Sequence, residues 1–192
     1  MEKIAYNLTT FNQGGVMIVW RGRRIGVDLM EVPGERTSRS FEIVRFGQGV
    51  AILPVLDDGR IVLIRQYRPA VEAAILEIPA GKVEKGEDLL SAAARELHEE
   101  TGITGADLRM MTSIWTTPGF CDEVIHIVLA RGGTIGKAQP EEDEWIDPPV
   151  FYSWKEIDHL VRTGGIRDSK TLVALGWAGS FMEDPRMRAE IP

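Results

Sequence analysis

The first part of the chain has the hydrophobic pattern of β-strands. In residues 16–32 the apolar side chains alternate and cluster as they do in strands, with an interruption around residues 21–24. Residues 41–46 are expected to form another strand. We place a boundary at Gln48–Gly49. The pattern therefore predicts a small N-terminal β extension over residues 1–48 and a main domain over residues 49–192.

The main domain mixes strands and helices. Residues 49–56 and 60–67 are rich in Val, Ile and Leu, and they flank Asp57-Asp58-Gly59, which is typical of a hairpin turn. Further strands are expected at residues 75–78, 108–116 and 124–130, and helices at residues 88–101, after the capping box Ser153–Glu156, and at about 168–181. Strands on both sides of a central helix, closed by a C-terminal helix, predict an α/β sandwich.

The central helix has a clear start, face and end. Residues 88–101 contain no Gly or Pro and are dominated by Ala, Leu, Glu and Arg, and Gly102 suits a C-terminal cap. At about 100° per residue, five apolar residues share one face. These are Leu89, Leu90, Ala93, Ala94 and Leu97.

Three acids converge beside that face in the last turns of the helix. Glu96, Glu99 and Glu100 stand at i, i+3 and i+4, where like charges repel one another and oppose the helix dipole. A hard divalent cation would remove the conflict, and Mg²⁺ suits because it also binds phosphates. The alternative is a solvated acidic face. Arg95 is either a surface residue or a partner that pairs with Glu99 or Glu87.

Composition limits the classes of function. The net charge of −7 and the pI near 5.1 argue against a nucleic-acid-binding surface. Cys121 is the only cysteine, so no intramolecular disulfide can form and a cytoplasmic location is expected. We identify neither a signal peptide nor a membrane span, and we expect no membrane partner.

The segment from residue 81 to residue 103 carries a family resemblance. It matches the pattern G-x5-E-x7-R-E-U-x-E-E-x-G-U, with U aliphatic, at Gly81, Glu87, Arg95, Glu96, Leu97, Glu99, Glu100, Gly102 and Ile103. In this it resembles the Nudix hydrolases. The resemblance implies an α/β/α sandwich around a mixed sheet and a metal-dependent enzyme that cleaves a nucleoside diphosphate linked to another group.

The resemblance also implies a ligand set. Glu96 and Glu100 would be the principal metal ligands, with Glu99 close behind, and the backbone carbonyl of Ala80 would be a further ligand. Glu87 would support rather than ligate, and Arg95 would hold the carboxylates in place. The expected cofactor is Mg²⁺, with Mn²⁺ as a possible substitute.

Three shorter segments resemble the ADP-ribose and ADP-sugar pyrophosphatases within that family. They are Arg65–Arg68 with the run Leu76–Gly81, the loop Thr117–Glu123, and Asp168–Thr171. The resemblance implies hydrolysis of ADP-ribose to AMP and ribose 5-phosphate. The alternatives are another nucleoside diphosphate sugar, such as an ADP-hexose or GDP-mannose, and a non-catalytic sensor of nucleotide sugars.

The same resemblance suggests substrate contacts. Arg68 would fork onto a phosphate, with pairing to Glu72 as the alternative. Pro118 would shape a loop over the terminal sugar, or belong to an ordinary turn. Glu123 would hydrogen-bond a ribose or position water, or simply be solvated.

Two further expectations rest on the family. A glutamate in the acidic loop 141–144 would activate the attacking water, with Glu142 the best match and Glu144 the second. The N-terminal extension would exchange between the subunits of a homodimer, and the alternative is a ragged extension of the main sheet.

Overall fold

The computed structural model describes residues 15–34, 37–140 and 145–183, and the chain divides into two compact units. The first unit consists of the described residues before Gln48, joined by residues 117–123. Its three-stranded antiparallel sheet has the order β1-β2-β3. The strands are β1 (Val16–Arg21), β2 (Gly26–Val32) and β3 (Arg39–Arg45), where strands were predicted.

Residues 117–123 attach to this sheet through backbone and side-chain contacts. The N–H of Val44 donates to the carbonyl of Phe120 at 2.7 Å, and the N–H of Asp122 donates to the carbonyl of Val44 at 3.1 Å. The Asp122 carboxylate also accepts the N–H of Phe46 at 2.8 Å and pairs with Arg45 at 3.2 Å. The segment that contains Pro118 is thus part of the first unit, which its sequence position did not indicate.

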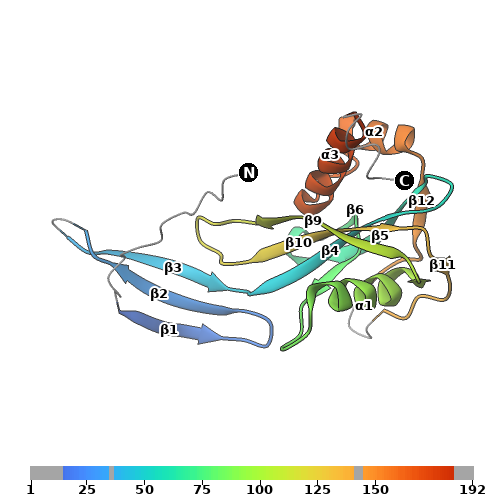
Figure 1. Cartoon of the computed structure of the whole chain (residues 1–192). Helices are drawn as coiled ribbons and strands as arrows, with labels where there is room; N and C mark the ends of the chain where they lie inside the picture. Colours follow the sequence, from blue (N-terminus) through green and yellow to red (C-terminus); the bar gives the residue numbers. More distant parts are fainter. Residues whose placement is uncertain (1–14, 35–36, 141–144, 184–192) are drawn as a thin grey trace, which may run out of the picture. The chain divides into compact units, whose positions relative to one another are not determined.

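The second unit is built on a seven-stranded mixed sheet (Figure 1). Five strands run in the order β12-β5-β4-β10-β9, with β6 paired to β5 and β7 paired to β4. They are β4 (Gln48–Val55), β5 (Ile61–Arg68), β6 (Ala73–Glu77), β7 (Ala80–Lys82), β9 (Asp107–Trp115), β10 (Val124–Arg131) and β12 (Val150–Tyr152). The sheet is mixed because β10 pairs parallel to β4 and antiparallel to β9. A separate pair is formed by β8 (Ile103–Thr104) and β11 (Thr134–Ile135).

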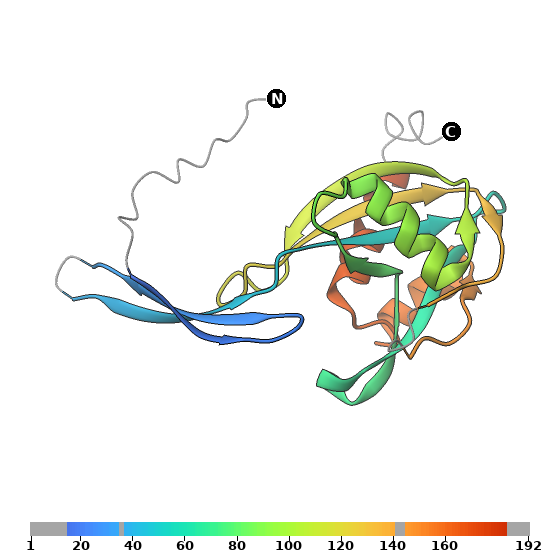
Figure 2. The ribbon, with the colours of Figure 1, turned by 90° about the horizontal axis from the view of Figure 1, so that it is seen from below.

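Three helices and one short 3-10 turn complete this unit. They are α1 (Leu89–Thr101), α2 (Trp154–Arg162), α3 (Ser169–Glu183) and η1 (Pro69–Val71). Asp88 caps α1 by accepting the N–H groups of Leu90 and Ser91, and Gly102 ends it with φ of 74°. The capping box predicted at Ser153 and Glu156 opens α2. Figure 2 shows the β5–β6 hairpin, with η1 at its tip, projecting from the rest of the unit.

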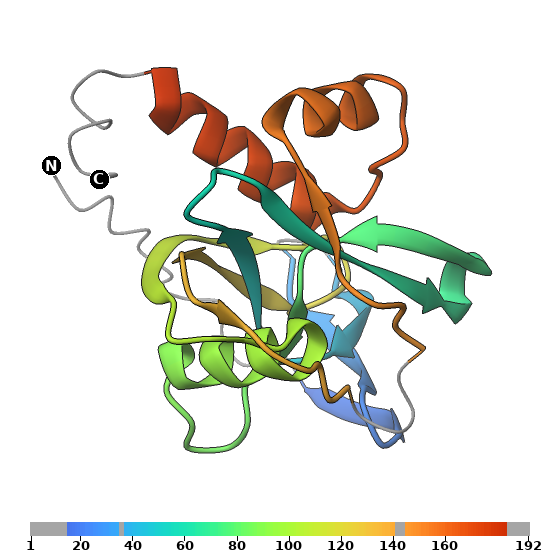
Figure 3. The same cartoon turned by 90° about the vertical axis from the view of Figure 1, so that its right-hand side faces the viewer.

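The alternation of side chains along β4 separates two cores. Val50 and Ile52 face α1, whereas Ala51 and Leu53 face α2 and α3, and all four are at most 1% exposed. Figure 3 shows the consequence, with α1 on one face of the sheet and α2 and α3 on the other. The predicted α/β/α sandwich is confirmed. The short strands β7, β8, β11 and β12 were not predicted, because two or three residues carry too little periodicity.

None of the helices in the described residues is long and apolar enough to cross a membrane.

A buried carboxylate holds the first unit together. Asp28 is 4% exposed and pairs with Arg21 at 2.6 Å and with Arg45 at 2.8 Å. The hydrogen bond from Arg45 lowers the pKa of Asp28, and burial opposes this shift. All three strands of the sheet are therefore linked through Asp28, and Arg45 extends the link to residues 117–123.

Replacing Asp28 by Asn should increase hydrogen exchange at the amides of β2 and β3 at about pH 7, because the ion pairs are lost. A carboxylate with a lowered folded pKa stabilises above its unfolded pKa of about 3.9, and this effect is lost as the pH falls through the folded pKa. The difference between the two proteins should therefore shrink as the pH is lowered below the unfolded pKa. Asp58→Asn, in the exposed pair with Arg60 of the second unit, is the control. A difference that persists unchanged at low pH would contradict this role of Asp28.

Candidate active site

Helix α1 buries two of its carboxylates together with its apolar residues. Glu96 is 7% exposed and Glu100 is 1% exposed, beside Ala92, Ala93 and Leu97. The apolar face predicted for this helix is partly wrong, because Leu90 and Ala94 are exposed. The buried stripe is rotated toward the acids, since β7 and Arg95 supply the polar partners that make their burial tolerable.

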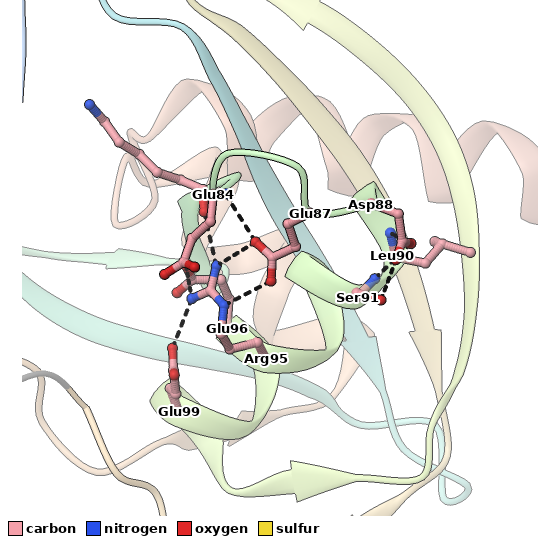
Figure 4. A network of polar contacts seen from close by, with 9 residues as sticks. Glu84, Glu87, Asp88, Leu90, Ser91, Arg95, Glu96 and Glu99 are labelled. Atoms are coloured by element: carbon pink, nitrogen blue, oxygen red, sulfur yellow. Dashed lines mark hydrogen bonds and ion pairs between the residues drawn. The ribbon is translucent and has the colours of Figure 1, made fainter.

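Arg95 is the centre of the acidic cluster (Figure 4). Its Nη1 donates to Oε1 of Glu96 at 2.7 Å and to Oε2 of Glu99 at 3.1 Å. Its Nε and Nη2 fork onto the two oxygens of Glu87 at 3.0 and 3.1 Å, and Nη2 also donates to the carbonyl of Lys82 at 3.0 Å. The Arg95 guanidinium thus contacts three carboxylates of the sequence motif, those of Glu87, Glu96 and Glu99.

The loop before the helix is held by the same arginine. Glu87 accepts the N–H of Glu84 at 3.0 Å in addition to the Arg95 fork. The hydrogen bond from Arg95 is the main cause that lowers the pKa of Glu87, and the hydrogen bond to Glu87 is the main cause that raises the pKa of Arg95. Glu87 is therefore held ionised as the anchor of the Gly81–Glu87 loop.

The backbone of β7 lies directly against the two buried acids. Oε2 of Glu100 accepts the N–H of Ala80 at 2.8 Å. A Cβ placed on Gly81 would lie 2.0 Å from Oε1 of Glu96, so any larger residue would displace that carboxylate. Glycine at position 81 thus leaves the space in which the Glu96 carboxylate lies.

The donor set fits a hard divalent cation in its chemistry. It consists of the carboxylates of Glu96, Glu99 and Glu100, which are all oxygen donors, and Glu100 lies against the backbone of Ala80. Within the part of the chain that the structure describes, no group of three His, Cys, Asp or Glu side chains is arranged to hold an ion as it stands. Glu96 and Glu99 instead direct their carboxylates at Arg95.

A second ionic cluster lies in the same unit. Arg68 forks onto Glu77, with Nε at 2.8 Å and Nη2 at 2.9 Å from its two oxygens, rather than pairing with Glu72. Lys170 also pairs with Glu77, and with Asp168 at 3.0 Å. The sequence motifs contained all four residues, but nothing in their spacing indicated that Lys170 and Glu77 would meet.

The remaining predicted site residues fall elsewhere. Pro118 and Glu123 belong to the first unit, whereas α1 and Arg68 belong to the second. Glu142 and Glu144 lie outside the described residues.

Comparison with known proteins agrees with the family resemblance that the acidic helix and the loop before it carry. The model of the NUDIX domain matches residues 45–174. A methanol dehydrogenase activator of Bacillus methanolicus is 39% identical over 161 residues, covering 82% of this chain and 86% of that protein. An ADP-ribose pyrophosphatase of Bacillus subtilis (strain 168) is 38% identical over 151 residues, covering 78% and 80%.

A solved structure extends the likeness to the fold. The crystal structure of an ADP compounds hydrolase superposes with a TM-score of 0.78 at 25% identity, covering 88% of this chain and 92% of that one. With the domain model matching well over half of the residues, the chain belongs to the Nudix family and is a Nudix hydrolase.

Proposed function

We propose that this Nudix hydrolase cleaves the diphosphate bond of ADP-ribose and releases AMP and ribose 5-phosphate. The observation that carries the proposal is the acidic face of α1, where Arg95 holds Glu87, Glu96 and Glu99 at the end of a glycine loop. The similarity of the chain to an ADP-ribose pyrophosphatase and to an ADP compounds hydrolase supports this substrate class. A cytoplasmic location is consistent with the single cysteine.

Nudix hydrolases generally use a divalent metal, and we propose Mg²⁺, with Mn²⁺ as a substitute. Glu96 and Glu100 would be its principal ligands, joined by Glu99 and the carbonyl of Ala80. Bound there, the metal would neutralise charge on the diphosphate and lower the pKa of a water molecule.

The protein's own groups would then orient the reaction. Arg95 sets the positions of the carboxylates, and the Glu87 fork keeps Arg95 in place. Arg68 would donate to a phosphate oxygen through the part of its guanidinium outside the Glu77 fork. We assign the general base to Glu142, with Glu144 as the alternative, and the contacts of Pro118 and Glu123 to the sugar moiety.

We further propose that the protein is a homodimer formed through its N-terminal sheet. Among the residues that the structure describes, strand β1 pairs only with β2, and five consecutive residues, Val16 to Trp20, are between 52% and 63% exposed. Successive strand residues point to opposite faces, so both faces of this apolar edge strand are exposed. A second copy of the same strand would bury these apolar side chains.

Purified protein with Mg²⁺ should convert ADP-ribose to AMP and ribose 5-phosphate faster than it converts ADP-hexoses or GDP-mannose. Product analysis by chromatography across this panel measures the preference as kcat/KM. A higher kcat/KM for another nucleoside diphosphate sugar would transfer the proposal to that sugar. Binding without any product would favour the non-catalytic sensor.

Glu96→Gln and Glu100→Gln should each lower kcat by ~10²-fold or more, because each removes a charged oxygen ligand. Both should also weaken Mn²⁺ binding, measured by paramagnetic relaxation of water. Glu84→Gln removes the same charge from an exposed position in the preceding loop and should leave both readouts unchanged. Retention of wild-type kcat and Mn²⁺ affinity in both variants would exclude the ligand assignment.

Light scattering at micromolar concentration should give the mass of a dimer, and Ile18→Glu in β1 should give a monomer, because a charge cannot be buried in an apolar interface without a partner. Val161→Glu changes an exposed apolar residue of α2 in the second unit and should leave the dimer intact. A monomeric wild-type protein would refute the assembly.

A further inference from the structure

The cluster around Glu77 contains a buried ion pair. Glu77 is 1% exposed and Lys170 is 6% exposed, and Arg68 joins them from β5. Burying a carboxylate costs free energy unless cations and hydrogen bonds compensate it. Glu77 has two such cations, although the two hydrogen bonds of the Arg68 fork already pair both of its oxygens.

The first turn of α3 supplies more than the lysine. Asp168 accepts both the N–H and the hydroxyl of Thr171, at 3.0 and 2.6 Å, and its other oxygen pairs with Lys170 at 3.0 Å. The hydroxyl oxygen of Thr171 in turn accepts the N–H of Ile78 at 2.9 Å. Lys170 is therefore held by Asp168, at the start of its own helix, in addition to Glu77.

The cluster around Glu77 lies close to the proposed metal ligands in the sequence, and it interacts electrostatically with one of them. Ile78 is bound by α3, and Ala80, two residues later, is bound by Glu100 of α1. Both Glu77 and, more weakly, Glu100 raise the pKa of Arg68 against the effect of burial. The Arg68 side chain remains 37% exposed, and its Nη1 lies outside the fork.

We propose that Lys170 is a positioning residue for substrate binding, acting through Glu77 on Arg68. Lys170 contacts the same oxygen of Glu77 that accepts Nη2 of Arg68. It thereby orients the plane of the carboxylate and with it the planar fork of Arg68. Lys170 also offsets part of the charge of Glu77, so that Arg68 keeps positive potential for a diphosphate. This inference rests on the proposed function.

The alternative is that the cluster only attaches α3 to β6. The two roles differ in whether the effect of Lys170 on substrate binding requires Arg68. A positioning residue loses its effect on substrate binding once Arg68 is removed, whereas a purely structural residue does not.

The test is a double-mutant cycle on the full-length protein. Lys170→Met removes the ammonium and keeps the apolar stem, and it should raise KM for ADP-ribose about tenfold, as expected for one misplaced charged hydrogen bond. Both kcat at saturating substrate and Mn²⁺ affinity should change less than about threefold. In an Arg68→Met background, Lys170→Met should leave KM unchanged. Lys155→Met, at an exposed position on α2, is the matched control.

An equal rise of KM in both backgrounds, or no rise in either, would overturn the proposal. If Lys170→Met does not fold, as judged by its thermal transition, the same cycle is run with Lys170→Gln, which retains a donor for Glu77 without the charge. The dissociation constant of ADP-ribose, measured by calorimetry without metal, should follow the same pattern as KM.

This binding measurement separates the two proposals. Wild-type protein that binds ADP-ribose without hydrolysing it refutes the proposed function, and the cycle on the dissociation constant then decides the role of Lys170. Wild-type protein that hydrolyses ADP-ribose without coupling between Lys170 and Arg68 refutes the present inference alone. Wild-type protein that neither binds nor hydrolyses ADP-ribose overturns both.

Discussion

The rest of this site depends on the Arg95 guanidinium, which binds the carboxylates of Glu87, Glu96 and Glu99. Glu96, Glu99 and Glu100 would repel one another in the last turns of α1, where the helix dipole is also unfavourable to them. Arg95 offsets this repulsion by contacting Glu96 and Glu99, and its fork on Glu87 ties the helix to the preceding loop. A cation that binds Glu96 or Glu99 would have to compete with Arg95 for their oxygens.

The short segment from Glu77 to Gly81 connects two charged clusters. At one end, Glu77 and Ile78 are held by Arg68 and by the first turn of α3. At the other end, Ala80 and Gly81 contact the buried acids of α1. The segment thus links α3, on one face of the sheet, to α1 on the other.

The N-terminal unit is organised by the same kind of interaction. Asp28 is buried between Arg21 and Arg45, and Arg45 extends the link to Asp122 in the segment that follows β9. The sheet therefore includes a segment from the far half of the sequence. The exposed strand β1 leaves this unit with an apolar edge, which is the physical basis of the proposed dimer.

The sequence by itself determined the longer elements and the identity of the acidic helix. Local signals sufficed for these, because the absence of Gly and Pro from residues 88–101, the glycine at Gly102, the turn at Asp57–Gly59 and the spacing of the glutamates act over a few residues. Only the tertiary structure decided which face of α1 is buried and that Lys170, far along the chain, shares Glu77 with Arg68. It also decided that residues 117–123 join the N-terminal sheet. These outcomes depend on partners brought together by folding, and the spacing of residues along a chain carries no information about such partners.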